Sequence, residues 1–166
     1  MPTLLAFPVL ILVIMLQTII VTSLPLLNGF ADLVLLVLVA WGLQDRVKHA
    51  WIWTAIAGLM VEYVSGLPQF VPLVGYFLVM AVARLVRRRV WQTPILAMFL
   101  VTFIGSIIMQ GTALAALLAN GTPLSIADSL NLIILPGTLL NLLLALPVYA
   151  VLVDLAQWLY PEEVEI

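Results

Sequence analysis

Long apolar runs separated by short polar turns are the feature that most limits how this chain can fold. Only 8% of its 166 residues are charged and 65% are hydrophobic, whereas an ordinary soluble domain carries about a quarter charged residues. So few polar side chains do not cover the surface of a soluble domain of this length. The chain is therefore predicted to be an integral membrane protein, with lipid as its main solvent.

The apolar runs are continuous rather than alternating, which indicates helices and not the strands of a membrane barrel. A spanning helix needs about 20 apolar residues, and fewer where neighbouring helices shield it. Six segments qualify, so the predicted fold is all-α: one transmembrane domain over 1–166, made of six closely packed helices. The predicted spans are about 4–22, 30–43, 50–64, 70–86, 93–118 and 129–159. The last one is too long for one straight span and contains Pro136-Gly137 and Pro147, so either a kink is expected or its first turns lie in the membrane interface.

The basic residues form two clusters that predict the orientation. The clusters are Arg46 and Lys48 between segments two and three, and Arg84, Arg87, Arg88 and Arg89 at the end of segment four. With six spans, both clusters and both termini lie on one side, which the positive-inside rule makes cytoplasmic. The triple arginine is predicted to be a cytoplasmic anchor that also attracts anionic lipid. Contact with a cytoplasmic partner is the alternative.

Tryptophan placement agrees with this orientation. All of the tryptophans map to helix ends on the predicted cytoplasmic side, namely Trp41, Trp51, Trp53, Trp91 and Trp158. An amphipathic indole is stable at the headgroup boundary of a bilayer. We therefore expect these side chains to lie at the membrane surface.

Catalytic and metal-binding chemistry finds little support in the sequence. The chain has no cysteine and only one histidine, so thiolate sites and histidine clusters are excluded. No nucleophile, base and oxyanion donors converge in the sequence. We expect no enzyme activity, no cofactor, no metal and no nucleic-acid partner, with membrane lipids as the surroundings.

Four polar residues are candidates for a partner contact or a pocket. An ionisable group within a span is costly and usually faces a partner or a cavity, which makes Glu62 informative. Asp32 lies near the same outer boundary, at the start of a helix whose dipole favours a negative charge. The two acids could share a polar site with glutamines such as Gln110, or simply reach external water from helix ends. Asn141 could form a hydrogen bond across a helix interface.

Small residues recur along the last two segments. Gly105, Gly111 and Gly137 are the candidate helix-packing positions, because small residues let helix backbones approach closely. Ordinary packing within the bundle explains most of this group. The alternative is that part of it receives a helix from another protein.

The order and spacing of several short patterns resemble the family of the rod shape-determining protein MreD over nearly the whole chain. The patterns are Gln17-Thr18, Ala31-Asp32-Leu33 followed by an aliphatic run, Gly58 to Gly66, the cluster Arg87-Arg88-Arg89, Leu135 to Asn141, and Pro147-Val148-Tyr149. Glu62 stands where the family more often has aspartate, and Ala31 replaces the usual proline. The resemblance supports a carry-over to Asp32 and Asn141 better than to segment four.

This resemblance implies a subunit of the bacterial elongation machinery in the inner membrane. Such a subunit binds the transmembrane helix of MreC and helps to couple the MreB cytoskeleton to peptidoglycan synthesis by RodA and its transpeptidase. The resemblance also implies a compact six-helix bundle similar to the substrate-binding subunits of energy-coupling-factor transporters.

The leading hypothesis is a non-enzymatic scaffold that holds a partner's transmembrane helix in a groove and thereby controls cell shape. The alternative is a small-molecule transporter, or its membrane substrate-binding subunit, with an external pocket near Glu62, Asp32 and Gln69. An ion channel is disfavoured because no span carries a repeated polar stripe.

Overall fold

The computed structural model describes residues 5–23, 29–89 and 93–160, with side chains in the first helix described up to Ile19. Throughout these ranges the chain forms helices and turns without a strand, so the all-helical prediction is confirmed. The helices are α1 (Ala6–Ser23), α2 (Leu33–Leu43), α3 (Ala50–Val64), α4 (Val71–Arg89), α5 (Pro94–Ala119), α6 (Ile126–Ser129), a π-helical turn η1 (Leu130–Ile134) and α7 (Leu135–Leu159). A helix therefore lies on each of the six predicted segments.

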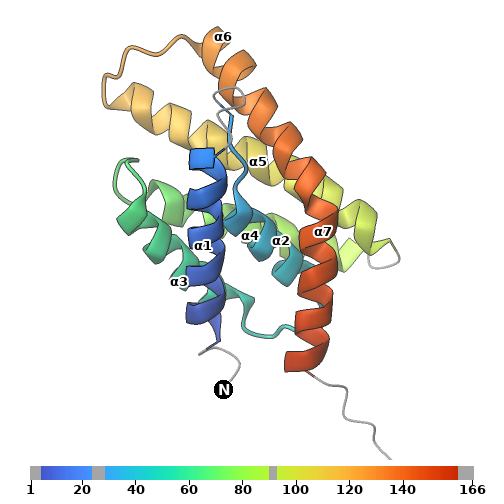
Figure 1. Ribbon diagram of the computed structural model, residues 1–166. Helices are drawn as coiled ribbons and strands as arrows, with labels where there is room; N and C mark the ends of the chain where they lie inside the picture. The colour runs from blue at the N-terminus through green and yellow to red at the C-terminus, as the bar shows by residue number, and fades with distance from the viewer. Residues whose placement is uncertain (1–4, 24–28, 90–92, 161–166) are drawn as a thin grey trace, which may run out of the picture.

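Helix α2 is the centre of the bundle. Every residue from Leu33 to Gly42 is buried, and α2 contacts α1, α3, α4, α5 and α7. Figure 1 shows it behind α1 and α7, enclosed by the other helices. A helix that is apolar on all sides suits lipid or a protein interior, and here the neighbouring helices cover it. With 11 residues, α2 is about 16 Å long.

Two continuous helices are long and apolar enough to cross a membrane, judged by length and composition. They are Pro94–Ala119, with 26 residues, and Ile126–Leu159, with 34. Helices α2 and α3 and the stretch Ala6–Ile19 of α1 are apolar but shorter. The six-span arrangement thus stays a prediction.

A π-helical turn lies in the last segment, where a kink is expected. The π-helical turn η1 ends directly before α7, and Pro136 is the second residue of that helix. Proline lacks an amide hydrogen, and its ring collides with the carbonyl four residues earlier in a regular helix. A π-helical turn widens the backbone at this point, which accommodates the proline.

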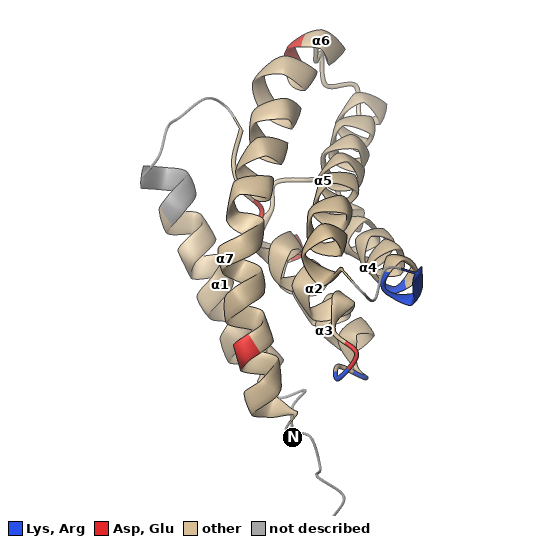
Figure 2. Cartoon of the chain, turned by 90° about the vertical axis from the view of Figure 1, so that its right-hand side faces the viewer, with Lys and Arg blue, Asp and Glu red and all other residues tan. Residues whose placement is uncertain are grey.

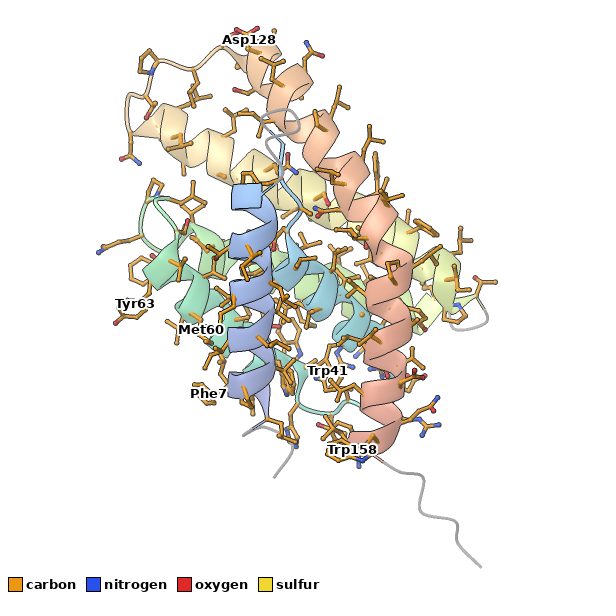
Figure 3. The ribbon with its side chains drawn as sticks, in the orientation of Figure 1. Phe7, Trp41, Met60, Tyr63, Asp128 and Trp158 are labelled. Carbon is orange, nitrogen blue, oxygen red and sulfur yellow. The ribbon has the colours of Figure 1, made fainter. Side chains whose placement is uncertain are left out.

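The tryptophans differ from the expectation in part. Trp41 and Trp53 are completely buried, with ring centroids 4.5 Å apart, so their predicted position at the membrane surface is wrong. The reason is that Trp41 lies on the enclosed helix α2. Trp51 and Trp158 are exposed, and Trp91 lies outside the described residues. Figure 3 places Trp41 and Trp158 toward the same end of the bundle, away from Asp128.

Candidate functional site

Asp32 is the N-cap of α2, and its side chain accepts a hydrogen bond from one of the first backbone amides of that helix. The first amides of a helix have no partner within it, and burial makes an unpaired amide costly. The Asp32 carboxylate accepts a hydrogen bond from the Leu35 amide at 2.9 Å, which confirms its predicted position at the positive end of the helix dipole. Its two oxygens also accept from the Tyr76 hydroxyl on α4, both at 3.1 Å.

Asn141 joins three helices at the same place. Its side-chain oxygen accepts a hydrogen bond from the Asp32 amide at 2.7 Å, and its Nδ2 donates to the Ser106 hydroxyl at 2.8 Å. Asn141 and Ser106 are both buried, on α7 and α5 respectively. The predicted cross-helix hydrogen bond is thus present, and it forms inside this chain.

Gln17 of α1 completes the polar cluster. Its Oε1 accepts a hydrogen bond from the Val34 amide at 3.3 Å. Side chains from α1, α4, α5 and α7 therefore converge on the N-terminus of α2. We call Gln17, Asp32, Tyr76, Ser106 and Asn141 the polar cluster.

A cavity of about 620 Å³ adjoins the polar cluster. All five residues of the cluster line it, together with apolar side chains of α3, α5 and η1 and with Gln110. Its volume is typical of a site for a small molecule. The structure therefore brings three of the four candidate polar residues, Asp32, Gln110 and Asn141, to one cavity.

Gln110 has an incompletely satisfied amide. Its Oε1 is buried without a hydrogen-bond partner. Its Nε2 lies close to Gly137, where an added Cβ would be 2.9 Å from that nitrogen and 3.2 Å from the Phe30 carbonyl oxygen. Gly137 thus lets Gln110 and the segment before Asp32 approach each other.

Glu62 lies outside the cavity lining. Its Oε1 accepts a hydrogen bond from the Phe70 amide at 2.7 Å, and Phe70 has a positive φ of 67°. That conformation is uncommon for a residue with a side chain. Glu62 therefore stabilises the turn between α3 and α4. A polar site shared by Glu62 and Asp32 is not formed.

The candidate glycines fall into two classes. Gly105 packs inside the bundle, since a Cβ there would lie 3.1 Å from Val79 of α4, and Gly137 is likewise internal. Gly111 is exposed, with nothing within 4 Å of an added Cβ, so its prediction as a packing position within the fold is wrong. The two α5 glycines are six residues apart and thus about 120° apart around the helix.

The three arginines at the end of α4 differ in their contacts: Arg87 bonds within the chain, and Arg88 and Arg89 face outward. Arg87 pairs with Asp45 at 2.8 Å and donates to the Gln44 carbonyl oxygen at 3.4 Å, so it anchors the loop before α3. Arg88 and Arg89 are exposed. Figure 2 shows the basic residues gathered at the end of α4 and on that loop. Arg84, which was not among the candidates, donates to the Val47 carbonyl oxygen at 2.6 Å.

The arrangement at the cavity suits binding. Tyr76 was not among the candidate residues, although it is the one polar side chain between Gln69 and Arg84 in the sequence. Within the described ranges, no group of three or more His, Cys, Asp or Glu side chains is placed to hold a metal ion.

Comparisons with protein-family models, curated proteins and solved structures give no match to the chain.

Proposed function

We propose that the chain is a non-enzymatic membrane scaffold of the bacterial elongation complex, related to MreD, that binds MreC and acts in cell-shape control. One observation carries this proposal. The patterns that resemble the family lie far apart in the sequence, yet Gln17, Asp32 and Asn141 meet at the start of α2. Convergence of family-like residues on one cluster is expected if they serve one shared fold.

The outer surface supports the membrane location. Helix α7 exposes Leu139, Leu143 and Val151 by more than half of their surface, and α5 exposes a similar row of large apolar side chains. Apolar surfaces of this extent suit lipid or a partner helix. In the proposed topology six helices span the inner membrane, and both termini lie in the cytoplasm with the basic residues.

The partner surface is proposed on α5. Gly105 and Gly137 are used for packing within the bundle, so they are not available to another helix. Gly111 and Ala115 are both exposed and lie four residues apart on one face of α5, a spacing that permits close helix approach. The MreC transmembrane helix is the proposed occupant of this face, and RodA, its transpeptidase and MreB are reached through the complex.

Co-purification tests the partner surface. Ala115→Leu is expected to reduce recovery of MreC with the tagged chain, because a larger side chain keeps the helices apart. Ala81→Leu is the matched control, since Ala81 is an exposed alanine on α4. Equal recovery from both variants would contradict this surface.

Depletion of the chain from its own cells tests the function itself. Rounded cells are expected if the chain acts in wall elongation. Rod-shaped cells that require an added nutrient would instead support an uptake role.

The cavity favours a second candidate function, that of a membrane substrate-binding subunit. Its volume of about 620 Å³ and its polar cluster are the features that a small-molecule site requires. The depletion experiment above separates the two functions.

A further inference from the structure

The cavity has apolar walls and one polar end. Its walls include Val61, Met109, Leu114 and Ile133, and the polar cluster and Gln110 supply the polar groups near the start of α2. Thr18, Ser65 and Ser129 also line it, with their hydroxyls bonded to nearby backbone groups. A ligand that fits this lining has a mostly hydrocarbon body and a polar group at one end.

Asp32 places a carboxyl group at the polar end of the cavity without a cation beside it. Among the described lining residues it is the only carboxylate, and none is Lys, Arg or His. The basic side chains of the sequence lie instead at the end of α4 and on the loop before α3 (Figure 2). Its hydrogen bonds come from neutral donors, the Leu35 amide and the Tyr76 hydroxyl. Charge in an apolar interior is costly until an opposite charge pairs with it.

Gln110 also lines the cavity, and its amide has an acceptor without a partner. Its Oε1 is buried and has no partner, and a buried acceptor gains free energy when a donor reaches it. The Gln110 amide and the Phe30 carbonyl both lie against Gly137, and Phe30 is two residues from Asp32. A carboxyl group without a paired cation and an amide with an unsatisfied acceptor therefore line the cavity, and they favour a ligand that donates hydrogen bonds and carries positive charge.

We infer that the cavity binds a lipophilic amine, whose ammonium group pairs with the Asp32 carboxylate while its hydrocarbon body packs against the apolar walls. This inference deepens the second candidate function by naming the ligand class. It is independent of the scaffold function, because a scaffold can hold such a ligand as well.

Binding of two matched probes to the purified chain tests this site. Decylamine and decanol have the same hydrocarbon chain, and only the amine is charged. The protein is placed in phosphatidylcholine nanodiscs, whose lipid carries no primary amine, and binding is measured from the rise in Tm with probe concentration. Decylamine is expected to bind the wild type about tenfold or more tightly than decanol does, as for a charge-assisted hydrogen bond.

Two pairs of variants locate the site. Asp32→Asn is expected to bind decylamine about tenfold more weakly or worse, whereas Asp154→Asn makes the same change at an exposed position on α7 and keeps binding. Ala113→Phe fills the cavity without changing Asp32 and is expected to lose binding. Its control is Ala115→Phe, on the exposed face of the same helix.

Three results would overturn the inference: no binding of decylamine to the wild type, equal binding of decylamine and decanol, or unchanged decylamine binding by Ala113→Phe. The last result remains decisive even if Asp32→Asn does not fold. The scaffold function is tested separately by depletion of the chain, and cells that keep their normal shape after depletion would contradict that function.

Native mass spectrometry of protein released from its own membranes identifies the source of the ligand. A bound phospholipid with an amine headgroup would assign the source to the bilayer, and a bound water-soluble amine would assign it to the aqueous phase. A stoichiometric ligand without an amino group would contradict the inference.

Discussion

The two ends of α2 are closed in different ways. At the N-terminal end, side-chain oxygens of Gln17, Asp32 and Asn141 accept hydrogen bonds from backbone amides, and a cavity of about 620 Å³ lies beside them. At the C-terminal end, Trp41 and Trp53 pack in ring contact, and the cavity beside Gln44 and Arg87 is smaller, about 220 Å³.

At the C-terminal end, Arg87 donates to the Gln44 carbonyl oxygen and pairs with Asp45, and the Gln44 Nε2 donates to the Leu152 carbonyl oxygen of α7 at 3.0 Å. The Asp32 carboxylate at the start of α2 and the Arg87 guanidinium at its end both match the helix dipole. The comparison teaches that one buried helix can have a packed end that supports stability and a hollow end that is free to bind.

The largest effect is expected at the packed end. Trp41→Ala removes a fully buried indole, and we expect it to lower the free energy of unfolding by about 4 kcal/mol. Titration with SDS in mixed micelles, followed by circular dichroism, measures this change. Decylamine binding in nanodiscs should stay near the wild-type level, and a loss of binding in the folded variant would break the separation between the two ends.

The polar cluster should show the next largest effect. Asn141→Leu leaves the Asp32 amide and the Ser106 hydroxyl without their partner, so we expect a loss of about 3 kcal/mol. The same SDS titration measures it. Asn131→Leu makes an identical change on the exposed face of η1 and should have little effect. Equal stabilities for the two variants would show that the cluster does not hold the hollow end together.

Alanine substitutions at two glycines are expected to change the free energy of unfolding in opposite directions, which gives a sharper test. Gly137→Ala places a Cβ 3.2 Å from the Phe30 carbonyl oxygen and closer still to Gln110, so we expect destabilisation by about 1 to 2 kcal/mol. Gly111→Ala meets open space and should stabilise α5 by about 0.5 to 1 kcal/mol, since alanine favours helix. Unfolding curves that shift in the same direction for both variants would contradict the internal position of Gly137.

The smallest effect is expected from the ion pair at the packed end. The Asp45 side chain is 65% exposed and that of Arg87 is 26% exposed, and such pairs contribute about 0.2 to 1 kcal/mol. Arg87→Gln should therefore lower stability by less than about 1 kcal/mol, and Arg89→Gln should be neutral. A rise in salt concentration should weaken the Arg87 contribution in the same titration.

Helix positions could be predicted well from the sequence, because long apolar runs and turn residues mark them directly. The role of Asp32 as a helix cap was also accessible, since an acidic residue directly precedes an apolar run. These features depend on neighbouring residues in the chain.

Features that depend on how the helices rotate against one another were less accessible. Glu62 and Asp32 were both placed at the outer boundary, but only Asp32 faces the cavity. The bond from the Phe70 amide to Glu62 requires a positive φ, for which sequence reasoning would expect glycine. Trp41 was expected at the surface because its position along the chain does not reveal that α2 is enclosed.

The hydrogen bond between the Asp32 amide and Asn141 joins residues 109 positions apart, which has a consequence for biosynthesis. While the ribosome is still making the first helices, the start of α2 lacks this acceptor. The short central helix reaches its final surroundings only when α7 has been translated. A chain truncated before Asn141 should therefore be held as an immature intermediate and degraded by membrane quality control, even though most of its helices are already present.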